Sequence, residues 1–175
     1  MTHLPVPPPG YLPSMTVTIV WYLLLQSARA SMWRLALLAL PGTLAHELAH
    51  LVVGFLLMAR PTGFSVWPKR SGHGWTLGSV TFRGINLFNG AAVALAPLLY
   101  LPLAWFCLIR LAAPFWVHHQ WGWWFGGGYL ISTILFAAMP SLQDIKQGGP
   151  SLLLYGTIGG LWWMFGSSVL RIGFH

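Results

Sequence analysis

The chain has 175 residues, enough for one domain. Only 6% of them are charged, against about 25% in ordinary soluble domains, and 56% are hydrophobic. So few charges cannot cover the surface of a water-soluble globule, which excludes a soluble enzyme and a disordered chain. Nine basic residues spread along the chain form no run typical of nucleic-acid binding. One cysteine excludes an intrachain disulfide.

Apolar runs of about 20 residues predict membrane-spanning helices. Residues 1–10 are a Pro-rich lead-in, and Tyr11–Leu25 is a short apolar run that is a fifth, shorter candidate span. Four longer runs are firm candidates: Leu35–Met58, Ile85–Ile109, Trp121–Met139 and Ser151–Leu170. We therefore predict an all-α polytopic membrane protein, a bundle of four to five transmembrane helices within a single domain, 1–175. Its expected place is a lipid bilayer, that of a bacterial cytoplasmic membrane.

The longest polar connection, residues 60–84, has the composition of a β-hairpin. Phe64–Trp67 and Trp75–Phe82 are rich in aromatic and β-branched residues, and the turn-forming stretch Pro68–Gly74 lies between them. This pattern predicts a small hairpin at the membrane surface.

The sequence His46-Glu47-Leu48-Ala49-His50 lies inside the second apolar run. Residues four apart share one face of a helix, so His46 and His50 can bind one Zn²⁺, and Glu47 can act as general base on a water held there. Ionisable groups within a membrane are costly and indicate a functional site. On a straight helix His46 would lie about 18 Å from Arg34, near mid-membrane, and Pro41-Gly42 predicts a bend one turn before it.

A catalytic zinc usually has three protein ligands. The chain has only two acidic residues, Glu47 and Asp144, so Asp144 is the remaining carboxylate for a third ligand. The alternative is an interfacial aspartate paired with Lys146. Pro140 predicts that the preceding helix stops early and that irregular backbone carries Asp144 back toward the site.

Asn89, near the start of the run Ile85–Ile109, has two equally favoured interpretations. Its amide can hold neighbouring segments together. It can also bind a substrate carbonyl or oxyanion.

Together these residues resemble the site-2 protease family of intramembrane zinc metalloproteases. The resemblance covers about residues 35–146 and rests on the His-Glu-Leu-Ala-His helix, the β-rich loop followed by Asn89-Gly90-Ala91-Ala92, and Pro140-Ser141-Leu142-Gln143-Asp144. It implies that His46, His50 and Asp144 are zinc ligands, that Glu47 is the catalytic base, and that the substrates are membrane proteins. The chain departs from the family's longer form, because Ile145 follows the aspartate where that form has glycine, and no PDZ-sized insertion is present.

Two other functions compete with a protease. One is a non-catalytic membrane scaffold or partner protein that retains a structural zinc, and the other is a zinc hydrolase acting on a lipid or small amide. Glu47 favours an enzyme, since a structural zinc site does not need it. A protease must also hold its substrate as an extended chain, and an unpaired edge of the predicted hairpin would supply backbone partners near the metal.

Overall fold

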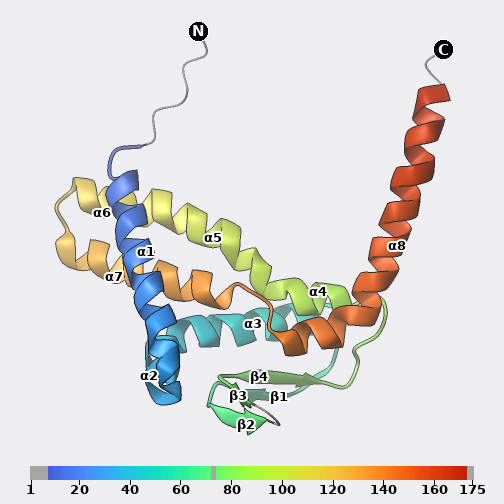
Figure 1. Ribbon diagram of the computed structural model, residues 1–175, viewed down its shortest axis with the longest axis horizontal. Helices are drawn as coiled ribbons and strands as arrows, with labels where there is room; N and C mark the ends of the chain where they lie inside the picture. Colours follow the sequence, from blue (N-terminus) through green and yellow to red (C-terminus); the bar gives the residue numbers. More distant parts are fainter. Residues whose placement is uncertain (1–7, 72–73, 173–175) are drawn as a thin grey trace.

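The computed structural model describes residues 8–71 and 74–172, with side chains for 8–70 and 75–164. The fold is mostly helical, with two small two-stranded sheets at one end of the molecule (Figure 1). Part of the predicted lead-in and part of the predicted turn Pro68–Gly74 lie outside the described residues.

The helices follow the predicted apolar runs, with different ends. Helices α1, α2 and α3 cover Tyr11–Ser27, Met32–Leu38 and Leu40–Leu56, with a single 3-10 turn, η1, at Ala28–Ala30. The rod Gly90–Val117 consists of α4 (Gly90–Leu95), η2 (Ala96–Leu99), α5 (Tyr100–Cys107), the π-helical segment η3 (Leu108–Ala112) and α6 (Ala113–Val117). Helices α7 and α8 cover Trp121–Ala137 and Leu142–Ile172.

By length and composition the described residues hold one to three candidate membrane spans. The rod Gly90–Val117 is 28 residues long, with a mean hydropathy of 2.1. The pairs α2–α3 and α7–α8 each qualify if a bent pair counts as one span. Helix α1, at 17 residues, is about 26 Å long, shorter than a bilayer core of about 30 Å. The sequence predicted four or five membrane spans, more than these one to three. The numbers differ because two helix pairs are bent and because α1 is short.

The predicted run Leu35–Met58 is broken rather than straight. Helices α2 and α3 meet at Ala39 with a bend of 72°, two residues before the Pro41-Gly42 pair at which a bend was expected. The Tyr129 hydroxyl donates to the Leu38 carbonyl oxygen at 2.8 Å, which satisfies an acceptor freed by the break. The separation of His46 from Arg34 that a straight helix would give therefore does not hold.

Residues 60–84 form two short antiparallel ladders of two strands each. The strands of the second ladder lie, in the sequence, between those of the first. Strand β1 (Pro61–Ser65) pairs antiparallel with β4 (Ser79–Phe82), and β2 (Lys69–Ser71) pairs with β3 (Gly74–Thr76). The prediction of β-structure here is confirmed, but its bounds were wrong. Trp67 lies between the ladders beside Pro68, which has no amide hydrogen to donate, and Lys69–Ser71 is a strand rather than a turn.

Close packing fixes α3 among its neighbours. Helices α3 and α1 both pack on α7, and α4 packs on α8. At Gly42 a Cβ atom would lie 2.1 Å from the Thr133 carbonyl oxygen, so glycine alone permits this approach of α3 to α7. Leu77, from the turn between β3 and β4, packs with Phe136 against the buried cluster of α1 and α2 residues that includes Leu25 and Leu35. The sheets are thus attached below α2 and α3.

Candidate metal centre

Three predicted ligands converge although they come from two distant parts of the sequence. His46 and His50 stand one turn apart on α3, and their Nε2 atoms are 3.1 Å apart. Asp144, from the first turn of α8, places Oδ2 3.3 Å from His46 Nε2 and Oδ1 3.2 Å from His50 Nε2. One ligand atom from each residue lies within 4.8 Å of the others.

Backbone carbonyls orient both imidazole rings. His46 Nδ1 lies 2.5 Å from the Ala137 carbonyl oxygen at the end of α7, and His50 Nδ1 lies 2.7 Å from the Val93 carbonyl oxygen in α4. A carbonyl oxygen can only accept, so each Nδ1 carries the hydrogen. In a neutral ring that leaves Nε2 as an acceptor, and both acceptors point at each other and at a carboxylate.

This donor set fits zinc. Imidazole nitrogens and carboxylate oxygens bind Zn²⁺ at about 2.1 Å, so two donors of a tetrahedral ion are about 3.4 Å apart. The 3.1 Å between the two Nε2 atoms, and the 3.3 and 3.2 Å from them to the two oxygens of Asp144, lie near that spacing. Three acceptors this close repel one another unless a cation lies among them, and a hydrogen bond from the far nitrogen of each histidine is the usual support of a metal ligand. Three protein ligands leave the fourth position to water or substrate.

A helix start, rather than irregular backbone, positions Asp144. Helix α7 ends at Ala137 and α8 begins at Leu142, with a bend of 51° between them. The early stop and a stretch of irregular backbone were predicted, and residues 138–141 form that stretch; Asp144 itself, however, lies beyond it in the first turn of α8. The Ser141 backbone N–H donates to Asp144 Oδ2 at 2.6 Å, and the Asp144 N–H donates to Ser141 Oγ at 3.2 Å. This reciprocal pair is a capping box, readable in the sequence as Ser-x-x-Asp and missed there.

The alternative pairing of Asp144 with Lys146 has no counterpart in the described residues. The ion pairs of that carboxylate join it to His46 and His50 alone. Lys146 is exposed to the outside, two residues farther along α8.

Glu47 lies with the three candidate ligands in one cavity of about 260 Å³, enough for several water molecules at about 30 Å³ each. Its side chain is 5% exposed, and the space that a Cβ atom on Gly78 would need is filled by its carboxylate. The other walls are largely apolar, with Leu77, Val80 and Phe82 from the sheet region and Phe136 and Met139 from the end of α7. A carboxylate, a space large enough for water and the candidate metal ligands therefore share one cavity.

Asn89 lies outside this cavity lining. Its Nδ2 donates to the carbonyl oxygens of Gly84 at 2.9 Å and Leu57 at 3.3 Å, and its Oδ1 accepts from the Asn86 backbone N–H. This geometry favours the first of the two interpretations, an amide that joins the end of the β-rich loop to the end of α3. The oxyanion-binding role of Asn89 stays a prediction. It would require the Asn89 amide to break its hydrogen bonds to the Gly84 and Leu57 carbonyl oxygens.

Helix α4 also holds the helix that carries Asp144. A Cβ atom on Gly148 would lie 2.4 Å from Ala94 Cβ and 2.9 Å from the Gly90 carbonyl oxygen. Ser151 Oγ donates to the Leu87 carbonyl oxygen at 2.7 Å, and the Tyr155 hydroxyl donates to the Phe88 carbonyl oxygen at 2.8 Å. Helix α4 thus supplies the Val93 carbonyl oxygen to His50 and also packs closely against α8.

Comparisons with protein-family models, with curated proteins and with solved structures found no match to this chain. The assignment of a function therefore rests on the chemistry of the site.

We predict that the purified protein holds about one zinc ion per chain. Replacing both His46 and His50 by alanine removes two of three ligands, so zinc content should fall below about a tenth of an ion per chain. The matched control replaces His118 and His119, the adjacent pair near the start of α7. Metal analysis after gel filtration decides the outcome. Equal zinc content in both double variants would contradict the assignment. A wild-type protein that holds no zinc would contradict it too, and would mean that a proton, rather than a metal ion, is shared among His46, His50 and Asp144.

A second prediction concerns the close packing of α8 on α4 at Gly148. Gly148→Ala should push α8 away from Ala94 and move Asp144 from the histidines, lowering zinc affinity by about 10–100-fold, as the loss of ligand support does elsewhere. Gly149→Ala is the matched control, because its Cβ atom would meet nothing within 4 Å. Competition with a zinc chelator measures both variants. Equal affinities would show that the contact at Gly148 does not position Asp144.

Proposed function

We propose that the protein is an intramembrane zinc metalloprotease, similar to the site-2 protease family, that hydrolyses peptide bonds in or near transmembrane segments of membrane proteins. The observation that carries the proposal is the convergence of His46, His50 and Asp144 beside Glu47 in one cavity. A ligand set for zinc together with an uncommitted carboxylate is the equipment of a metal-dependent hydrolase.

The residues have separate tasks in this proposal. His46, His50 and Asp144 hold Zn²⁺, which when bound supplies Lewis acidity to the scissile carbonyl and makes water a stronger acid. Glu47 accepts a proton from the attacking water on a carboxylate oxygen and then donates it to the leaving amine. The Ala137 and Val93 carbonyl oxygens keep the rings of His46 and His50 in the tautomer that presents Nε2 to the metal.

The polytopic arrangement of four to five transmembrane helices belongs to the same proposal. Large apolar side chains are exposed along α1 and along α8 up to Met164, for example Leu12 at 64%, Leu23 at 60% and Trp162 at 76%. Lipid is the solvent in which such surfaces are stable. A tilted or locally thinned bilayer would accommodate the short helix α1.

The free edge of β4 suits an extended substrate. Ser79, Val80 and Phe82 of β4 line the cavity, whereas β1, its only partner among the described strands, contributes nothing to that lining. A transmembrane helix must unwind before cleavage, and its freed backbone groups then need partners. In this proposal the unpaired edge of β4 supplies them by adding the substrate as a further strand.

A scaffold that retains zinc is the second candidate function, and one observation favours each side. The three converging ligands suit this candidate as well, because a structural zinc needs ligands and no base. Glu47, however, is buried and lines the same cavity as the ligands, and within the described residues its carboxylate makes no hydrogen bond or ion pair that a structural role would provide. An unused carboxylate is costly to bury, and catalysis explains it.

Glu47→Gln tests the catalytic role. The amide has nearly the same shape but cannot accept the proton, so cleavage should fall at least about 100-fold while zinc content stays at the wild-type value. The assay is a panel of single-span membrane peptides incubated with the purified protein in vesicles, with products identified by mass spectrometry.

Two variants serve as controls for that assay. Asp144→Asn should lower both zinc content and cleavage, whereas Lys146→Ala should change neither. Full cleavage by Glu47→Gln would remove Glu47 from catalysis. No cleavage of any peptide by a zinc-loaded wild-type protein would favour the scaffold.

The β4 edge gives a separate prediction. Val80→Pro removes an amide hydrogen from β4 and should lower cleavage at least about tenfold without loss of zinc. Phe64→Pro is the matched control, because Phe64 stands opposite Val80 on β1, away from the cavity. Equal effects of the two substitutions on cleavage would assign the loss to damage of the sheet.

A further inference from the structure

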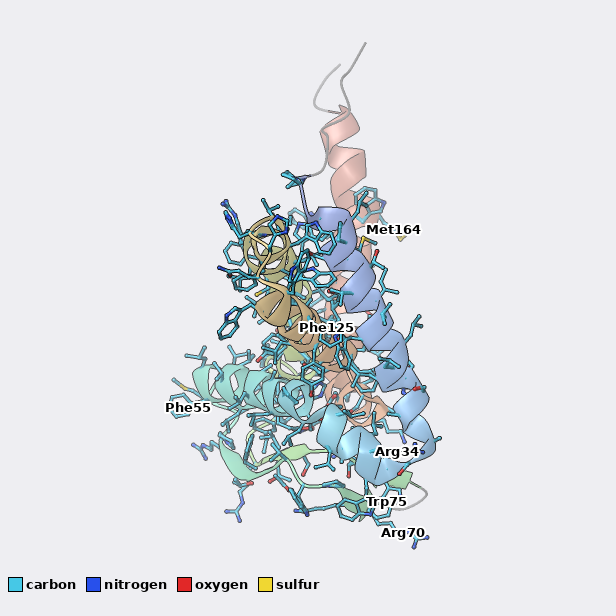
Figure 2. The ribbon with its side chains drawn as sticks, turned by 90° about the vertical axis from the view of Figure 1, so that its left-hand side faces the viewer. Arg34, Phe55, Arg70, Trp75, Phe125 and Met164 are labelled. Atoms are coloured by element: carbon cyan, nitrogen blue, oxygen red, sulfur yellow. The ribbon has the colours of Figure 1, made fainter. Side chains whose placement is uncertain are left out.

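The end of the molecule that carries the sheets and α2 combines basic and aromatic side chains. Figure 2 shows Arg34, Trp75 and Arg70 at this end, with Phe125 and Met164 farther up the molecule. We define the basic–aromatic end as six exposed residues, three from each chemical class: Arg34, Lys69, Arg70, Trp33, Trp67 and Trp75.

Two segments that are distant in the sequence build this end together. Trp33 and Arg34 are in α2, and the other four residues belong to or flank the ladder of β2 and β3. Leu77, just after β3, packs against the cluster that contains Leu35 of α2, which holds the two segments together. Within the ladder Arg70 stands opposite Trp75, so a guanidinium and an indole share one face of the sheet. The sequence alone, with its dispersed basic residues, does not show this gathering.

Among the described residues these cations have no carboxylate partner. The sequence contains two acidic side chains, Glu47 and Asp144, and both line the metal cavity. In the described residues the only ion pairs join Asp144 to the two histidines. The basic–aromatic end therefore carries positive charge whose counter-ions must come from outside the chain's own side chains.

We propose that the basic–aromatic end binds the headgroups of anionic phospholipids in the membrane that holds the protein. Arg and Lys donate to headgroup phosphate oxygens, and indole rings settle at the boundary between headgroups and acyl chains. Three exposed indoles at 57%, 61% and 47% are costly in water and stable at that boundary. A second protein with an acidic surface would match the charge, but the combination of cations and indoles in a chain with candidate membrane spans favours the lipid boundary.

This binding rests on the membrane placement in the proposed function but not on proteolysis, and it has a consequence for the cavity. Trp75 and Thr76 belong both to the β3 strand and to the cavity lining. Headgroups that hold β2 and β3 thus hold one wall of the metal cavity in place. The lipid composition of the membrane becomes a determinant of the order of that wall.

The test measures amide hydrogen exchange of β2 and β3 in lipid nanodiscs. The full chain is reconstituted in neutral phosphatidylcholine or with about 30% phosphatidylglycerol, and the anionic lipid should slow exchange at least about fivefold, because each basic residue near an anionic surface contributes by about that factor. About 1 M NaCl should abolish the difference, since it screens exposed charges beyond about 3 Å.

Variants and probes make the result decisive. Lys69→Gln with Arg70→Gln should lose the difference between lipids, and Arg34→Gln, which leaves the strands unchanged, should reduce it. Arg110→Gln should keep it, because Arg110 lies in η3, toward the opposite end (Figure 1). Equal exchange of the wild type in the two lipids would overturn the proposal, as would a difference that persists in the Lys69 and Arg70 double variant. Protection in neutral discs by inorganic phosphate, or by a soluble poly-glutamate peptide alone, would assign the end to a free anion or to a protein partner instead.

Discussion

Two hydrogen bonds from histidine to backbone carbonyl are the constraint on which the rest of the site depends. A backbone oxygen cannot change its place without moving its helix, so His46 and His50 are aligned only while α7 and α4 keep their positions on either side of α3. A side-chain partner would have left each ring a range of orientations. The metal centre is therefore a property of the helix arrangement more than of α3 alone.

The close helix contacts serve this arrangement. Gly42 brings α3 against α7 one turn before His46, and Gly148 brings α8 against α4 one turn after Asp144. His46 and Asp144 thus each lie one turn from a close helix crossing that a glycine permits, and small residues at helix crossings are common in membrane proteins. The third ligand then needs only a helix start at the right place, which Ser141 supplies.

The local chemistry of the site could be predicted from sequence, but its assembly could not. His46, Glu47 and His50 follow from helical spacing, and Asp144 follows from the short list of acids; the structure brings these four together. The β-rich loop was also foreseen, with its strand ends misplaced. The break at Ala39 was missed by two residues because a proline bends a helix over a range of positions. The carbonyl partners of the histidines carry no sequence signal, since every residue has a carbonyl. Ser141 did carry one, its Ser-x-x-Asp spacing to Asp144, which was overlooked.

The double use of Asp144 links two equilibria. The same carboxylate closes the first turn of α8 and faces the two histidines, so folding of that turn and occupation of the site by a cation share one group. Thermodynamic linkage then requires reciprocity: whatever tightens the helix start raises affinity for the ion by the same free energy with which the ion tightens the helix start. Helix α8 continues from this turn for the rest of its 31 residues. Removal of the metal by a chelator would thus first loosen the N-terminal turn of α8, the longest helix in the described part of the chain.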